Sequence, residues 1–202
     1  MPSTGIHLLV AHTLKPNASE YYWIGNFAPD YSNSKEVRNN LHLRNTVDHW
    51  DALEKLYLQI DKNNDFDIGW FTHLFVDTCW DEIEQNEHKN WFMSLNLDDN
   101  WYAHYREEIG IISYYLYNNL PWSKNIWKII EKSQINKIIT SLSFSVPELE
   151  EYRDQIVNKH SESSSEQIPT FFSLNDIINL TNNIAEKFNN WIKKDFTQPN
   201  KR

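Results

Sequence analysis

Apolar residues recur along much of this chain at the three- and four-residue spacing of amphipathic helices. Val47, Trp50, Leu53 and Leu56 form one such stripe, within a helix that begins near Thr46 and ends near Ile60. The pattern therefore predicts an all-α fold. Helices are expected over 3–14, 46–60, 67–85, 98–119, 121–132, 147–159 and 173–196, and the segments 35–43 and 134–144 are candidates for further short helices.

Polar and turn-forming residues separate these helices. Residues 19–33 are expected to be a turn-rich connection, 61–67 a polar turn, and 160–169, rich in Ser and Glu, an exposed linker before the last helix. No internal repeat is evident. The prediction is a single all-helical domain over 1–202, with about seven or eight helices around a metal-binding cleft.

Composition supports this class and narrows the function. The chain of 202 residues has 9 Trp, 10 Tyr and 10 Phe for a core, and only 4 Gly and 7 Pro, which disfavours a turn-dense β fold. A formal charge of -9 argues against a broad basic surface for nucleic acid, although bound cations would weaken that argument.

The location of the protein is predicted from what the sequence lacks. Cys79 is the single cysteine, so no internal disulfide can form. The first residues have no basic region of the secretory type, and no apolar stretch approaches the roughly 20 residues that span a membrane. We expect a cytoplasmic protein with no transmembrane segment.

Two helices carry a histidine and a carboxylate four residues apart: His73 with Asp77, and His104 with Glu108. On a helix this spacing puts both side chains on one face, one turn apart. A histidine nitrogen and a carboxylate oxygen that converge in this way can chelate a divalent ion, and zinc accepts both ligand types. The pairs therefore indicate a metal site.

Each pair also has a simpler explanation. Such pairs are common on helix surfaces, and two buried pairs could satisfy each other without a metal. Burial of ionised groups among aromatic residues is costly, and a cation would neutralise several carboxylates at once. Of the other histidines, His12 lies about 140° around the first helix from His7, so the two are not expected to share a site. His88 is expected to be solvated, and His160 lies in the predicted linker.

The order of several motifs adds to this picture. GIHLLVAH contains His7, a G-N-x-A-P-D loop ends at Asp30, and His42 follows about a dozen residues later. G-W-x-x-H-L-x-x-D then ends at Asp77, and H-x-x-x-E begins at His104. This order resembles the zinc-dependent phospholipase C and P1-type nuclease superfamily, in particular its uncharacterised bacterial phospholipase C-like hydrolases. The resemblance covers roughly residues 5–110.

The resemblance implies a set of zinc ions in a cleft between helices. It implies Asp30 as the aspartate that activates water. By position, the implied ligands are Asp30, His42, His73 and Asp77 around a central pair of ions, His104 and Glu108 around a further ion, and His7 at another.

The chain departs from the superfamily pattern in two places. Secreted members use the amino group of a mature N-terminal Trp as a ligand, whereas this chain begins at Met1. They also place a histidine shortly after the H-x-x-x-D motif, where this chain has Asp81 and Glu82. We therefore expect two or three zinc ions (Zn2+), and whether Asp81 or His12 joins the site stays open.

The resulting hypothesis is a zinc-dependent hydrolase of phosphoester bonds. Its substrate would be a phospholipid head group, a nucleotide or a small phosphomonoester, with nucleic acid only as a substrate. One alternative is a non-catalytic all-helical protein that binds a metal or has a structural role. Another is a di-iron carboxylate bundle, which needs Glu-x-x-His on two helices, and the order of the motifs here disagrees with it.

Overall fold

The computed structural model describes residues 2–95, 100–163 and 168–194. Every regular element in these ranges is helical and no strand occurs there, which confirms the predicted all-α class. The helical segments outnumber the seven or eight predicted. In chain order they are α1 (Thr4–Leu14), α2 (Glu20–Phe27), η1 (Ala28–Asp30), α3 (Lys35–Leu41), α4 (His49–Gln59), α5 (Asp65–Ile83), η2 (Glu84–His88), α6 (Lys89–Ser94), α7 (Trp101–Asn119), α8 (Ser123–Lys132), η3 (Ile135–Lys137), α9 (Val146–Ser161) and α10 (Leu174–Trp191).

One predicted connection and one candidate helix are wrong. The supposed turn-rich connection at 19–33 contains α2, because Trp23, Ile24 and Phe27 bury their side chains in the core and no proline lies within that helix. The candidate helix at 134–144 is only the short turn η3. There the Thr140 hydroxyl donates to the Asp67 carboxylate, which holds the segment in a non-helical conformation.

The ends of other helices also differ from prediction. The supposed linker starts inside α9, where His160 is buried, while residues 164–167 of that prediction lie outside the described residues. Residues 98, 99 and 196, expected at helix ends, also lie outside them. Helix α5 continues into the π-helical segment η2. His88, which was expected to be solvated, is therefore buried in an aromatic cluster, and its Nδ1 lies 3.3 Å from the Tyr105 hydroxyl.

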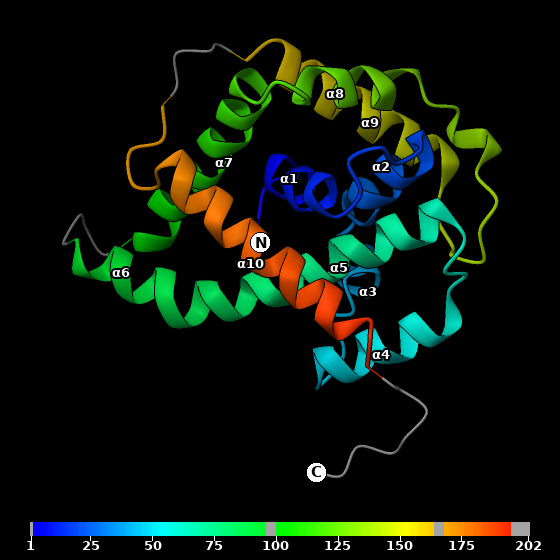
Figure 1. Cartoon of the computed structure of the whole chain (residues 1–202), viewed down its shortest axis with the longest axis horizontal. Helices are drawn as coiled ribbons and strands as arrows, with labels where there is room; N and C mark the ends of the chain where they lie inside the picture. The colour runs from blue at the N-terminus through cyan, green and yellow to red at the C-terminus, as the bar shows by residue number, and fades with distance from the viewer. Residues whose placement is uncertain (1, 96–99, 164–167, 195–202) are drawn as a thin grey trace.

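Helix α1 lies at the centre of the fold, surrounded by α2, α5, α7, α8, α9 and α10 (Figure 1). Its residues 5–11 are all buried, so α1 has no solvent face over two turns. A chain of hydrogen bonds ties it to two outer helices. The Gly5 N–H donates to Ser113 Oγ (2.9 Å) on α7, and Ser113 Oγ contacts His160 Nε2 (2.9 Å) on α9.

Helices α2 and α5 cross unusually closely, at a pair of glycines. A Cβ atom added to Gly25 would lie 2.2 Å from the Phe66 carbonyl oxygen, and one added to Gly69 would lie 2.2 Å from the Tyr22 carbonyl oxygen. Both obstacles are backbone atoms, which cannot move aside as a side chain can. The two helices can therefore approach this closely only because both positions lack a side chain.

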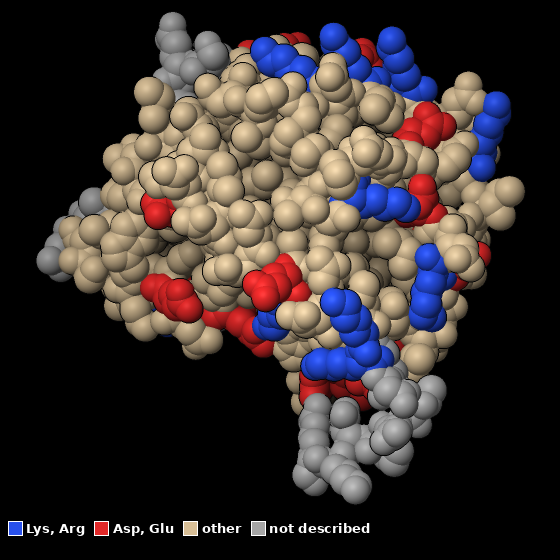
Figure 2. Space-filling model, viewed as in Figure 1, with Lys and Arg blue, Asp and Glu red and all other residues tan. Residues whose placement is uncertain are grey.

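The distribution of charge on the surface and the apolar character of the helices bear on what the protein can bind. On the face shown in Figure 2, acidic and basic side chains are interspersed around a large uncharged area, and no basic surface spreads across it. Among the described residues, no helix has both the length and the apolar character needed to cross a membrane.

We predict that Gly69→Ala lowers the free energy of unfolding by more than about 2 kcal/mol, because the new methyl group meets backbone. Gly110→Ala is the matched control, since nothing lies within 4 Å of a Cβ atom there. In the interior of α7 it should instead raise stability by about 0.5–1 kcal/mol. Urea unfolding of the three proteins measures both effects, and equal changes of the same sign would contradict the proposed helix crossing.

We also predict that His160 makes stability depend on pH. Burial lowers the pKa of His160 from 6.5 to about 4, so the folded protein keeps the ring neutral where the unfolded chain binds a proton. Stability from this residue is complete above pH 6.5 and is lost as pH falls towards 4, by up to roughly 3 kcal/mol. In urea unfolding, His160→Gln should reduce this fall relative to the wild type; parallel pH curves would disprove it.

Candidate metal centre

Five of the seven residues predicted as metal ligands meet in the core. They come from four parts of the chain: His7 from α1, Asp30 from η1, His42 from the C-terminal end of α3, and His73 and Asp77 from α5. The donor atoms fall into two groups. Within each group all donor atoms lie within 4.8 Å of one another, and His73 belongs to both groups. The groups are His7 with His73 and Asp77, and Asp30 with His42 and His73.

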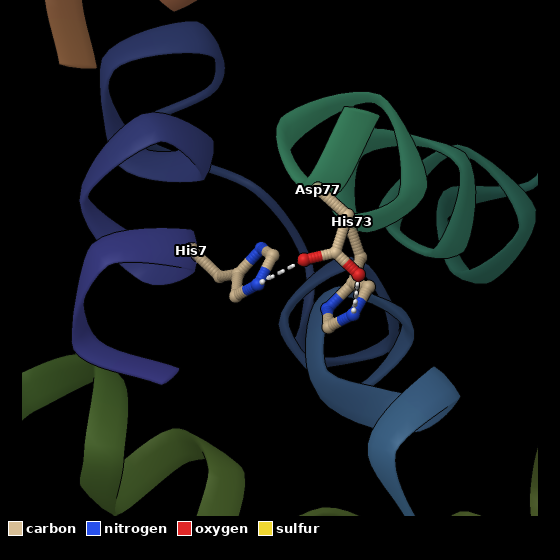
Figure 3. A group of neighbouring side chains, drawn as sticks. All are labelled: His7, His73 and Asp77. Atoms are coloured by element: carbon tan, nitrogen blue, oxygen red, sulfur yellow. Dashed lines mark ion pairs between the residues drawn. The ribbon is translucent and has the colours of Figure 1, made fainter. Parts of the chain in front are cut away.

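The Asp77 carboxylate lies between the histidines of α1 and α5 (Figure 3). Its Oδ1 is 3.4 Å from His7 Nε2, and its Oδ2 is 3.5 Å from His73 Nε2. The rings of His7 and His73 stack almost in parallel, with their centroids 3.9 Å apart. One carboxylate therefore faces two imidazoles with two different oxygens.

His42 is the third member of the second group, with Asp30 and His73. Its Nε2 lies 3.1 Å from Asp30 Oδ1, 3.4 Å from Asp77 Oδ2 and 3.2 Å from His73 Nε2. Asp77 Oδ2 is thus shared between His42 and His73. Besides His73, which belongs to both groups, Asp77 therefore contacts members of both.

Backbone carbonyls determine which nitrogen of each ring faces the centre. The Nδ1 of His73 lies 2.7 Å from the Asn26 carbonyl oxygen, and that of His42 lies 2.7 Å from the Arg38 carbonyl oxygen. A carbonyl oxygen only accepts hydrogen bonds, so each Nδ1 carries the proton. In the neutral rings both Nε2 lone pairs then point at each other across 3.2 Å, and a hydrogen-bonded Nδ1–H of this kind is typical of metal-ligating histidines.

Sequence analysis missed these two supporting carbonyls. The Arg38 carbonyl lies four residues before His42, a spacing that the predicted helix 35–43 already contained. The Asn26 carbonyl had no such signal, because it reaches His73 only through the crossing of α2 and α5. The Asn26 side chain is also buried and has no hydrogen-bond partner.

The centre is almost closed to solvent and its polar atoms are incompletely satisfied. His7 and His73 are each 1% exposed and Asp77 is 6% exposed, whereas the Asp30 side chain retains 18%. Among the described residues, neither oxygen of Asp77 has a hydrogen-bond donor and His7 Nδ1 has no partner. A buried carboxylate without donors is costly, so these atoms call for a positively charged partner.

The pKa shifts of these residues reflect two opposing effects, burial and the charges of neighbouring groups. Burial opposes ionisation of Asp77, yet the charge of His73 and the contact with His7 hold its pKa well below the usual range. Burial likewise opposes ionisation of Asp30, but its contact with His42 lowers its pKa. For His73, burial favours the neutral ring, but Asp77, Asp30 and the Asn26 carbonyl together raise the pKa. Burial and the neighbouring His73 lower the pKa of His7 to about 4. The carboxylates stay ionised and need compensation from a cation or a proton.

The three separations that involve Asp77, 3.4–3.5 Å, are longer than usual hydrogen bonds and fit two ligands of one zinc ion. Ligand atoms about 2.0–2.2 Å from one tetrahedral zinc ion are separated by roughly 3.3–3.6 Å. The measured nitrogen–oxygen and nitrogen–nitrogen separations are 3.1–3.5 Å. The residue types and their spacing are therefore compatible with zinc held by imidazole nitrogens and carboxylate oxygens.

His104 and Glu108, predicted to hold a further ion, belong to neither group of described residues. Glu108 is buried, but its Oε1 accepts the N–H groups of Phe171 (2.6 Å) and Phe172 (3.1 Å). The carboxylate thus anchors the chain that leads into α10. An ion at this pair stays a prediction without support from the donor geometry.

Two residues left open by the sequence lie outside both groups. Asp81, one turn beyond Asp77, is half-buried and lies 4.0 Å from Arg44. His12 stacks on Trp122 with ring centroids 4.0 Å apart, on a different side of α1 from His7. The expected angular separation of His7 and His12 accounts for this.

No protein-family model, curated protein or solved structure matches this chain. The resemblance to the zinc-dependent phospholipase C and P1-type nuclease superfamily therefore stays a prediction.

We predict that His7→Ala, His73→Ala and Asp77→Ala each weaken metal binding at least about tenfold, since each removes a donor from the centre. His12→Ala is the matched control for His7, because both histidines lie on α1. Elemental analysis of the proteins as purified, with circular dichroism as a check of folding, measures the effect. Full metal content in folded His73→Ala and Asp77→Ala would rule out the assignment.

Proposed function

We propose that this chain is a zinc-dependent hydrolase of phosphoester bonds with a phospholipase C-like helical architecture. The observation that carries the proposal is the buried carboxylate of Asp77, which faces three histidines and has no hydrogen-bond donor. In the proposed centre, His42, His73, Asp30 and one oxygen of Asp77 would hold one ion. His7 and the other oxygen of Asp77 would contribute to a second.

Zinc bound at such a centre polarises a phosphoryl oxygen and lowers the pKa of a coordinated water. The residues of the chain have separate tasks in this proposal. The carbonyls of Asn26 and Arg38 keep His73 and His42 oriented, and Asp77 holds its charge between the two groups. Asp30, the most exposed of the carboxylates and ionised by its contact with His42, orients the attacking water and accepts its proton.

The order of the motifs is the second support for phosphoester chemistry. The A-P-D loop forms η1, which places Asp30 next to His42, and H-x-x-x-D forms one face of α5. The same elements carry the resemblance to the superfamily. The choice among a phospholipid head group, a nucleotide and a small phosphomonoester does not follow from this centre alone.

A non-catalytic metal site is the second candidate, and the burial of the centre favours it. His7, His42 and His73 are at most 6% exposed, so little of the centre is open to a substrate. A structural ion would need no such access. Turnover separates the two functions, whereas metal content does not.

We predict that the protein as purified contains zinc and hydrolyses at least one of three esters: p-nitrophenyl phosphate, bis-p-nitrophenyl phosphate and p-nitrophenylphosphorylcholine. Asp30→Asn should lower kcat by at least about 100-fold, because the water loses its proton acceptor. Most of the zinc should stay bound, because the Asn amide oxygen and the other donors of that ion remain. Rates and zinc content are measured on the same samples. Zinc without turnover on any ester would favour the non-catalytic site, and absence of any metal would refute both.

A further inference from the structure

A cleft of about 670 Å³ opens beside the candidate metal centre. It lies between α3, the end of α5, and α7. Its walls carry four cationic side chains among other polar residues. The lining residues are Lys35, Arg38, Asn39, Arg44, His49, Asp81, Glu84, Tyr102 and Arg106.

The cleft borders the centre on two sides. Asp81 follows Asp77 by four residues on α5, which places it one helical turn, or about 6 Å, further along the axis. Arg38 lies in the turn of α3 before His42, and its carbonyl holds the ring of that ligand. The cleft therefore lies about one helical turn from two of the donor residues, His42 and Asp77.

The charge of the cleft is opposite to that of the whole protein. Lys35, Arg38, Arg44 and Arg106 face only two carboxylates, Asp81 and Glu84, in a chain with a formal charge of -9. The ion pair between Arg44 and Asp81 spans 4.0 Å, the outer limit of such contacts. Within the described part of the chain, neither Lys35 nor Arg38 forms an ion pair. The cleft thus keeps a positive excess that an anion can use.

A second cleft beside the centre has the opposite character. It has a volume of about 390 Å³ and begins at Tyr31, directly after Asp30. Its far wall carries Glu148 and Glu151 and no cationic side chain. An anionic group is favoured on one side of the centre and disfavoured on the other, which gives a bound ester a defined direction.

We propose that the basic cleft binds a second phosphate group of the substrate, so that the protein selects phosphoesters with two phosphates about one helical turn apart. This inference rests on the proposed hydrolase function for the reacting phosphate only. Arginine side chains suit the task, since their planar guanidinium groups bind phosphate oxygens in pairs. An ester that is neutral or cationic beyond its reacting phosphate gains no binding affinity from this cleft.

The test measures binding of inorganic phosphate and inorganic triphosphate to the protein as purified, by isothermal titration calorimetry at low salt. Triphosphate should bind at least about tenfold more tightly than phosphate, because its terminal phosphates lie about one helical turn apart and can reach both the centre and the cleft. In the double variant Arg44→Gln with Arg106→Gln, this preference should fall to less than about twofold while zinc content stays unchanged. Both side chains are exposed, and Arg106→Gln alone serves as the second variant if the double variant fails to fold.

Lys128→Gln, an exposed cation of α8 that does not line the cleft, is the control for the loss of charge and should keep the preference. The inference would be overturned, even in an active hydrolase, if wild type and variants preferred triphosphate over phosphate equally, or if the wild type had no such preference. If the protein contains no metal, the proposed function fails. Loss of triphosphate binding in the variants would then still support an anion site in the cleft.

Discussion

The close crossing of α2 and α5 at Gly25 and Gly69 is the constraint on which the centre depends. Without side chains at these two positions, the backbones meet directly, and the end of α2 lies beside the middle of α5. This contact brings the Asn26 carbonyl within 2.7 Å of His73 Nδ1 and so directs Nε2 of that ring towards the centre. A backbone contact between two helices thereby determines which ring nitrogen of His73, one turn beyond Gly69, carries the proton.

The second constraint is electrostatic. A protein interior tolerates an ionised carboxylate only with charged or hydrogen-bonding partners, and the imidazoles around Asp77 contact it at 3.4–3.5 Å without donating. A proton on His73 or a cation between the rings would each supply the charge. The cation satisfies more atoms at once, because it can contact His42, His73 and both carboxylates that face them. In the proposed function, the basic cleft outside the centre would likewise attract an anionic substrate.

Short-range patterns in the sequence predicted a large part of this arrangement. The periodicity of apolar residues predicted the all-α class and most helices, since helical geometry repeats every 3.6 residues and is visible within one segment. The four-residue spacing of His73 and Asp77 predicted their shared face on α5. The A-P-D loop and the position of His42 indicated further donors, although that inference came from the order of motifs and not from any spacing on one helix.

Only the tertiary structure decided which of these residues meet. His104 and Glu108 have the same spacing as the pair on α5, yet Glu108 accepts two backbone N–H groups near α10 and lies outside the centre. His88, which looked solvated, is buried because α5 continues into η2. Spacing along one helix fixes a face but not what that face meets. Contacts between distant segments follow from how side chains fill the core, and the local pattern carries no record of that packing.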